Sequence, residues 1–152
     1  MSDVACNALP PYVTPFPKSL AREDIEFFSK KRLFNLPTPK FRDICLKSYV
    51  EWVHFFCPLL DLSDFLGSIA AGPDSSDKGV SLMLLYAVLL TGVAFVDESH
   101  ILEAGYESRL AVRKEFFTKA KVSRFPVAFI MVPHLCSTLT LYETIDLVFI
   151  RV

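Results

Sequence analysis

The stretch that decides the fold runs from Val80 to Val96, VSLMLLYAVLLTGVAFV, and it holds no charged residue and only two aliphatic hydroxyl side chains, Ser81 and Thr91. A helix of this length reaches about 25 Å, close to the width of a small domain and slightly short of a bilayer core. Its apolar residues run all round the helix, which is typical of a helix covered on every side. The stretch therefore predicts a buried central helix, in which Ala87 and Gly92 allow a neighbouring backbone to approach closely.

The same stretch leaves a second interpretation open, a small membrane protein that uses residues 80–96 as its single span. Lys78 precedes the stretch and Asp97 and Glu98 follow it, so neither flank carries the cluster of lysine and arginine that orients a span. The segments around it are amphipathic, and a lone span would not need such partners. We therefore expect a core helix and no membrane.

Composition and cysteine spacing limit the function further. The chain has 152 residues, of which 52% are hydrophobic, and a net charge of -1, so we expect one domain with a sizeable core and no general attraction to nucleic acid. No secretory signal is visible at the N-terminus, and we expect an intracellular, reducing setting. Cys6, Cys45, Cys57 and Cys136 form no close pair. His54 and Cys57 share a helix face, but two ligands do not make a metal site.

The chain before the central helix predicts a strap and a first helix. Residues 9–17, LPPYVTPFP, are held extended by their prolines, and we expect them to lie across the domain surface, although a ligand for a proline-binding groove is the alternative. Ser19 is the expected cap of a helix that continues to about Arg32. Ile25 and Phe28 form its apolar face.

A second helix is predicted from about residue 40 to 56, and Pro58 ends it. Its inward face, taken from spacings of three and four, comprises Phe41, Ile44, Cys45, Ser48, Trp52, Phe55 and Phe56. A short helix then begins near Ser63 and buries Phe65, Leu66 and Ile69. The polar residues 72–79 form a loop that leads into the central helix.

After the central helix, Asp97 or Ser99 is expected to cap a further turn, and Gly105 permits a bend. A last helix follows over residues 106–121. Its inward side chains are predicted to be Tyr106, Leu110, Phe117 and Ala120. Its cations are Arg109, Arg113, Lys114, Lys119 and Lys121. We expect these to form a solvated face, and a phosphate-binding face is the alternative.

Several blocks resemble a known family when they are taken in order. They are LPPYV, LPTPKFRDICLKSYVEWVHFFCPLLDLSDFL, LMLLYAVLLTGVAFVDE and AGYESRLAVRKEFFTKAK, which span about residues 9–121. They resemble the N-terminal part of the fungal-specific transcription factor domain, especially in proteins like cutinase transcription factor 1 beta. This domain is also called the middle homology region or xylanolytic transcriptional activator regulatory domain, and it follows a binuclear zinc-cluster DNA-binding motif.

The resemblance implies an all-helical, non-catalytic regulatory domain that acts in the nucleus through protein partners, with a homodimer possible. The zinc cluster needs six closely spaced cysteines, which this sequence does not have. We therefore expect no cofactor here, and DNA contact only through an upstream motif outside this chain.

The most characteristic block is the family's pattern of tyrosine, valine-histidine, proline and aspartate, which Tyr49, His54, Pro58 and Asp61 meet here. Phe55 departs from it, because the family commonly has proline directly after the histidine. The resemblance implies that these residues are scaffold. We expect a hydrogen bond between His54 and Asp61 to fix the angle between two helices. No serine in a strand-to-helix elbow accompanies them, so we do not expect an enzyme.

The chain changes character after Lys121. Residues 1–18 are the extended proline-rich segment and 19–121 the N-terminal part of the regulatory domain, whereas in 122–152 Pro126 and Pro133 interrupt apolar runs and the end alternates like a strand. Our hypothesis is that this tail comes from an unspliced intron or a shifted reading frame. We therefore expect an all-α bundle around residues 80–96, truncated, with an irregular or strand-like tail and poor solubility.

Overall fold

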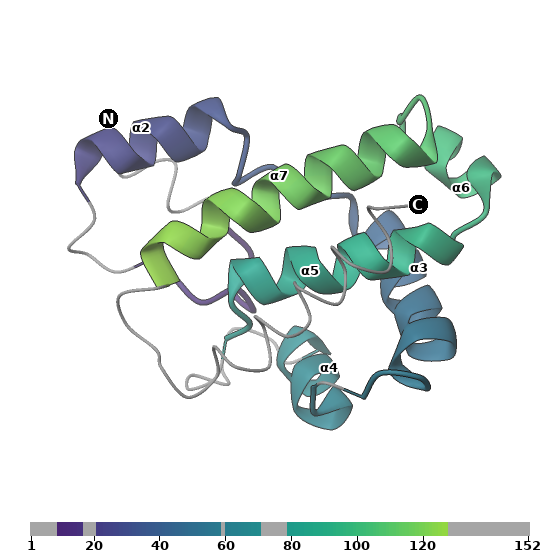
Figure 1. Ribbon diagram of the computed structural model, residues 1–152. Helices are drawn as coiled ribbons and strands as arrows, with labels where there is room; N and C mark the ends of the chain where they lie inside the picture. Colours follow the sequence, from purple (N-terminus) through teal and green to yellow (C-terminus); the bar gives the residue numbers. More distant parts are fainter. Residues whose placement is uncertain (1–8, 17–20, 59, 71–78, 128–152) are drawn as a thin grey trace.

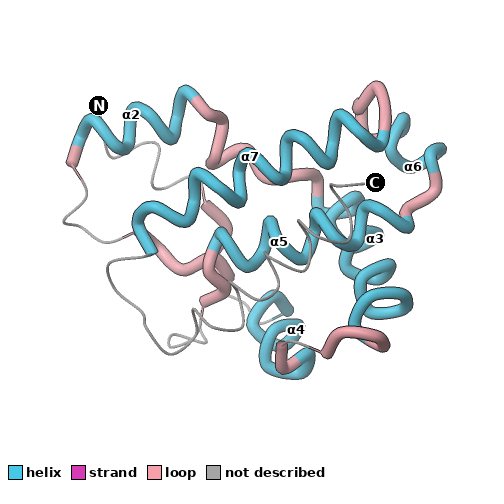
Figure 2. The backbone as a smooth tube through the Cα atoms, in the orientation of Figure 1, coloured by secondary structure: helices cyan, strands magenta, loops and turns pink. Residues whose placement is uncertain are grey.

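The computed structural model describes residues 9–16, 21–58, 60–70 and 79–127, and the elements of this part of the chain are helical (Figure 2). This confirms the all-α prediction. In chain order the elements are α2 (Arg22–Lys30), α3 (Pro39–Ser48), the π-helical turn η1 (Tyr49–His54), α4 (Leu62–Ala70), α5 (Leu82–Gly92), the 3-10 turn η2 (Val93–Phe95), α6 (Glu98–Glu103) and α7 (Arg109–Val127).

Helix α5 lies in the centre of the molecule, with α7 beside it and α3 at its C-terminal end (Figure 1). All of its residues except Leu84 are buried. The aliphatic hydroxyl groups are satisfied locally, because Ser81 caps the helix by accepting the N–H of Leu84 at 3.2 Å and Thr91 donates to the Val88 carbonyl at 2.8 Å. The predicted central helix is confirmed, although it begins at Leu82. Within the described residues, no helix is both long and apolar enough to cross a membrane.

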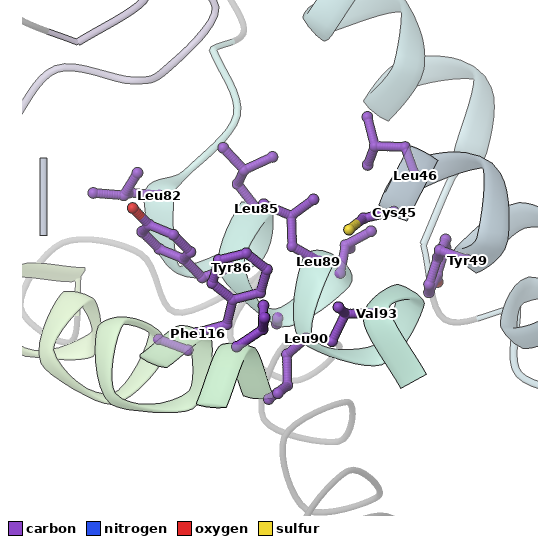
Figure 3. Packing of buried hydrophobic residues seen from close by; sticks show 14 of the residues in the cluster. Cys45, Leu46, Tyr49, Leu82, Leu85, Tyr86, Leu89, Leu90, Val93 and Phe116 are labelled. Atoms are coloured by element: carbon purple, nitrogen blue, oxygen red, sulfur yellow. The ribbon is translucent and has the colours of Figure 1, made fainter. Parts of the chain in front are cut away.

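Helix α7 packs along α5 through a face that differs from the predicted one. The ring of Phe116 lies 5.9 Å from that of Tyr86, and Figure 3 shows the two side chains together between the helices. Val112 and Ala120 are fully buried, whereas Leu110 is 57% exposed, so the prediction for Leu110 is wrong. The helix begins at Arg109, which leaves Leu110 in its first turn, and the side chains four residues apart from Val112 onward make the contact with α5.

Helix α3 meets the C-terminal end of α5 at backbone distance. A Cβ atom placed on Gly92 would lie 2.1 Å from the carbonyl oxygen of Cys45. Only a residue without a side chain fits there, which confirms the close approach predicted at Gly92. Figure 3 shows Cys45 directed toward the end of α5, close to Leu89 and Val93.

The predicted helix over residues 40–56 changes geometry halfway along. It is α-helical to Ser48 and π-helical from Tyr49 to His54. Phe41 and Cys45 are buried as predicted. Beyond Ser48 the buried side chains are instead Tyr49 and Val53, and the prediction that Trp52, Phe55 and Phe56 face inward is wrong. A π turn holds more residues than an α turn, so every side chain after it is rotated relative to the expected face.

The proline-rich strap is tied to the start of α5. Val13 and Val80 form a parallel bridge, in which Thr14 donates to the Val80 carbonyl at 3.0 Å and Val80 donates to the Tyr12 carbonyl at 2.8 Å. Gly79 permits this contact, because a Cβ on it would lie 2.8 Å from the nitrogen of Thr14. The strap across the surface is confirmed for the described residues 9–16.

The shorter helices follow the predictions at most positions. In α2, Phe28 is buried and Ala21 is the N-terminal cap residue, while Ser19 lies outside the described residues. In α4, Phe65 is buried, with Leu66 and Ile69 partly so. Asp97 precedes α6 without a side-chain cap, and Gly105 makes the predicted bend at a φ of 88°. The predicted irregular or strand-like tail of residues 122–152 is wrong for residues 122–127, because α7 continues through them to Val127. Cys6, Cys136, the loop at 72–78 and the tail from residue 128 lie outside the described residues.

Candidate functional site

The four family-motif residues lie in and just after η1, where the chain leaves α3 and enters α4. Asp61 caps α4, because its Oδ1 accepts the backbone N–H of Asp64 at 3.1 Å. Asp61 and His54 share no hydrogen bond, so the bond expected between them is wrong. The carboxylate serves the nearer backbone donor because α4 begins at Leu62, directly after it.

Tyr49 and His54 are brought together by η1 with polar atoms that lack partners. Tyr49 is 1% exposed and its ring centroid lies 6.0 Å from that of His54. The Tyr49 hydroxyl and His54 Nδ1 are buried and form no hydrogen bond with the described chain. Burial, together with the charge of the nearby Cys57 thiolate, raises the pKa of Tyr49 to about 12. The phenol is therefore neutral at physiological pH, and His54 has no carboxylate to orient it as a base.

The structure gives no grouping of metal ligands in the part of the chain that it describes. Cys45 is fully buried between α3 and α5, and burial raises the pKa of its thiol to about 12, so the thiolate needed for metal binding or nucleophilic attack is not available. Cys57 is half-buried and forms no disulfide. These two cysteines do not cooperate in one site, because Cys45 lies inside the core.

The main exposed feature of the described residues is two pairs of aromatic side chains on and next to η1, which we call together the aromatic surface: Trp52 with Phe95, and Phe55 with Phe56. Their exposed fractions are 55% for Trp52, 41% for Phe95, 81% for Phe55 and 80% for Phe56. Trp52 and Phe95 stack with ring centroids 6.0 Å apart, and Phe55 and Phe56 meet edge to face at 5.4 Å. The surface thus joins η1 and the following turn to η2 at the end of the central helix. Apolar spacing alone could not reveal it, because it depends on the π turn.

Acidic residues predominate in the sequence next to these rings. Exposed carboxylates at its edges, or at the starts of the helices that follow it, belong to Glu51, Asp61, Asp64, Asp97 and Glu98. The neighbouring cations are partly occupied: Lys47 lies 3.8 Å from Glu51, and Arg109 donates to the Val96 carbonyl at 2.8 Å. The aromatic surface therefore lies in a region of net negative charge.

The cations of α7 do not form the uniform solvated face predicted for them. Lys119 is 3% exposed, and its Nζ donates to the Asn35 carbonyl at 2.7 Å and pairs with Glu115 at 2.6 Å. It also lies 5.4 Å from the ring centroid of Tyr86. Lys121 lies over the ring of Phe117 at 4.1 Å. Since these cations act within the molecule, the helix does not offer its full set to phosphate, and the prediction of a solvated Lys119 is wrong.

A shallow cleft between α3 and α6 is occupied by the chain's own charges. Lys40 from the start of α3 pairs with Glu103 at the end of α6, and His100 Nδ1 lies 3.6 Å from the same carboxylate. The hydrogen bond from Lys40 is the main cause that lowers the pKa of Glu103. The pairing leaves the aromatic surface as the more prominent candidate for contact with another molecule.

Comparison with known proteins finds relatives over most of the chain. It is 39% identical over 114 residues to cutinase transcription factor 1 beta of Fusarium vanettenii, which is 75% of this chain and 13% of the relative. A transcription factor of Fusarium pseudograminearum is 36% identical over 117 residues, 76% of this chain and 13% of the relative. The fusaric acid cluster transcription factor FUB12 of Fusarium oxysporum f. sp. lycopersici is 36% identical over 106 residues, 70% and 15% of the two chains.

The chain thus spans about a seventh of the length of these curated relatives. No family model matches it, and no solved structure does either. The names of these relatives assign no role to the four motif residues or to the aromatic surface.

Proposed function

We propose that this chain belongs to the fungal transcription factors, and that it is a non-catalytic regulatory segment that takes part in regulation of DNA-templated transcription. The observation that carries the proposal is the similarity over about three quarters of the chain to relatives that are all named transcription factors. None of these names is that of an enzyme. The membrane-protein alternative is not favoured, because no described helix can span a bilayer.

The proposed segment acts through protein contacts, in the nucleus, and the binding of DNA falls to a zinc cluster encoded elsewhere. Two features support this. The chain carries no closely spaced set of six cysteines, and the exposed side chains that gather in one place are aromatic and acidic, which suits a protein partner better than a nucleic acid. A homodimer is one form that such contacts can take.

The motif residues Tyr49, His54, Pro58 and Asp61 act as scaffold in this proposal. Tyr49 fixes η1 in the core, and Asp61 caps α4, so together they set the direction of the chain between α3 and α4. Pro58 lies in the intervening turn, where it cannot continue a helix.

A tethering experiment tests the proposal. The full chain is fused to a heterologous DNA-binding domain with a nuclear localisation signal and expressed in a filamentous fungus that carries a reporter gene with the matching operator. We expect reporter transcript to differ at least about threefold from that obtained with the DNA-binding domain alone, in either direction. The matched control is the fusion with Gly92→Ala, which disrupts the contact of α5 with α3 and should return the transcript to the baseline.

The proposal fails if the folded, operator-bound fusion leaves transcription unchanged. Chromatin immunoprecipitation of the fusion confirms occupancy of the operator in each case. Fluorescence microscopy of the tagged chain, without the added localisation signal, tests the nuclear location separately.

A further inference from the structure

We infer that the aromatic surface is a docking site for a basic protein segment, one that presents lysine or arginine side chains between aliphatic ones. The inference rests on the proposed function, because it names the kind of partner that this regulatory segment contacts. It is carried by three observations: the fixed exposure of the rings, the cations that cover other aromatic side chains of the chain, and the charge around the site.

The exposure of the rings is built into the fold. Tyr49 and Val53 point into the core from the same π turn that carries Trp52, so the turn cannot rotate to bury the indole without expelling them. Phe95 is held in the same way, since its neighbours Val93 and Val96 are both buried. The stack of Trp52 on Phe95 therefore stands at the surface on a rigid base, which lowers the entropic cost of binding.

Elsewhere in the described chain, three accessible rings are each covered by a cation of the same molecule. Lys31 lies 5.8 Å from the ring centroid of Phe27, Arg42 lies 5.1 Å from that of Tyr12, and Lys121 lies 4.1 Å from that of Phe117. No lysine or arginine of the described chain lies over Trp52, Phe55 or Phe56. Trp is the strongest of the aromatic partners for a cation, so within the described residues the best such site is not used by the chain's own cations.

The charge around the site favours the same partner. Glu51 precedes Trp52, and Asp97 and Glu98 follow Phe95, so carboxylates flank the stack on both of its segments. Lys47 pairs with Glu51 at 3.8 Å and Arg109 is engaged by the Val96 carbonyl, whereas no cation is next in sequence to the exposed carboxylates of Asp97 and Glu98. A segment with lysine or arginine gains from both the rings and the carboxylates, and its aliphatic side chains cover Phe55 and Phe56.

Other occupants fit this region less well. Phosphate groups of a nucleic acid would be repelled by the carboxylates. A second copy of the chain, docked through the same surface about a two-fold axis, would bring two sets of carboxylates of like charge to one interface. A basic, partly aliphatic segment is the occupant that matches both the apolar and the charged part of the site.

Trp52 is the only tryptophan of the chain, so its fluorescence reports directly on the surface. The test uses the full chain fused to a tryptophan-free solubility partner, titrated with two synthetic peptides of about 18 residues, long enough to form a helix. Both have leucine on one face; the first has lysine and arginine at the remaining positions, and the second has glutamate there. We expect a saturable blue shift with the basic peptide and binding at least about tenfold weaker with the acidic one.

Variants identify the residues responsible. Phe55→Ala combined with Phe56→Ala should weaken binding of the basic peptide about tenfold, and Phe27→Ala, a matched exposed phenylalanine on α2, should leave it unchanged. Glu51→Gln combined with Asp97→Asn should bring the affinities for the two peptides closer together. Far-UV circular dichroism of each variant verifies that the helices are retained.

Four results would overturn the inference: no saturable shift with the basic peptide, equal affinity for the acidic one, a shift that depends on protein concentration without peptide, or emission typical of a covered indole in the free chain. The last two would assign the surface to a second copy or to the chain itself. These results leave the tethering experiment untouched, so failure of this inference and failure of the proposed function are distinguishable.

Discussion

Helix α5 and the segment of η1 with the turn after it are both rich in large apolar side chains, but they differ in how far these side chains are buried. Ten of the eleven residues of α5 are buried, whereas Trp52 in η1, with Phe55 and Phe56 just after it, is largely in solvent. The difference arises from backbone geometry. Gly92 and the small residues of α5 let α3 and α7 close around it, while the π turn rotates large aromatic side chains away from the same core. In these two segments, the regular α-helix buries the apolar side chains as their pattern predicts, and the π turn does not.

The largest effect is expected where the two regions meet, at Gly92. The substitution Gly92→Ala places a methyl group against the Cys45 carbonyl, and the helices must separate, so we expect a loss of about 3 kcal/mol or more of the free energy of unfolding. Chemical denaturation followed by circular dichroism measures it. The control is Gly67→Ala in α4, where nothing lies within 4 Å of the new methyl group and we expect a gain of up to about 1 kcal/mol. Equal stabilities of the two variants would contradict the backbone contact.

The next largest effect is expected at alkaline pH, where a buried thiol in the core makes the free energy of unfolding depend on pH. Burial raises the pKa of Cys45 from 9.0 to about 12, so the folded state holds a proton that the unfolded state releases. The resulting stability is complete below pH 9 and is lost as the pH rises toward 12. At about pH 11 the loss from Cys45 alone should be roughly 2–3 kcal/mol. Denaturation curves across this range measure the loss, and Cys45→Ala should flatten the pH dependence. Tyr49 and Tyr106, with pKa values raised to about 12, act in the same direction.

Removal of a satisfied hydroxyl group from α5 should have a smaller effect. The Tyr86 hydroxyl donates to the Leu33 carbonyl at 2.9 Å in the interior, so Tyr86→Phe leaves a buried acceptor with one partner fewer and should cost about 1–2 kcal/mol. Thermal and denaturant unfolding of the variant check this value. A loss below the experimental error would mean that water reaches the carbonyl.

The corresponding substitution in η1 should have the opposite sign. The Tyr49 hydroxyl is buried without a partner, so Tyr49→Phe removes an unsatisfied polar group and should raise the free energy of unfolding by up to about 1 kcal/mol. The pair Tyr86→Phe and Tyr49→Phe, measured under the same conditions, is the most direct test of the comparison. Destabilisation by Tyr49→Phe would indicate an ordered water on this hydroxyl group.

The smallest change in stability is expected on the aromatic surface. Phe55→Ser combined with Phe56→Ser alters two side chains that are each about four-fifths exposed, so the free energy of unfolding should change by less than about 0.5 kcal/mol. Solubility should increase, because the exposed apolar area becomes smaller. Light scattering during concentration measures solubility, and a large loss of stability would place these rings in the core after all.

The sequence predicted what depends on local chemistry. The uncharged run of α5, the proline strap, the small residue at Gly92 and the bend at Gly105 each follow from the residue types present. The exposure of Trp52 and the burial of Lys119 were not predicted, for two different reasons. A π turn has no clear residue signature, and it changes the phase of every later side chain. Lys119 is buried because α7 places it against Asn35 and Tyr86, residues from distant segments.

The motif residues show the same division. The family resemblance implied that Asp61 is a scaffold residue, and we expected His54 to be its hydrogen-bond partner. The actual partner, the backbone N–H of Asp64, lies three residues away and follows ordinary helix-capping chemistry. A local rule was sufficient for this contact, and a long-range pairing was not needed.

The bridge between Val13 and Val80 bears on how the molecule is assembled during synthesis. The strap leaves the ribosome early. Its hydrogen-bond partner Val80 lies just before α5 and is synthesised only when about half of the chain has been made. Until that residue emerges, Tyr12, Val13 and Thr14 have no ladder to join, so docking of the strap is a late step that requires α5. Stalled chains that end before residue 80 should therefore keep the strap open to proteases, and longer ones should protect it.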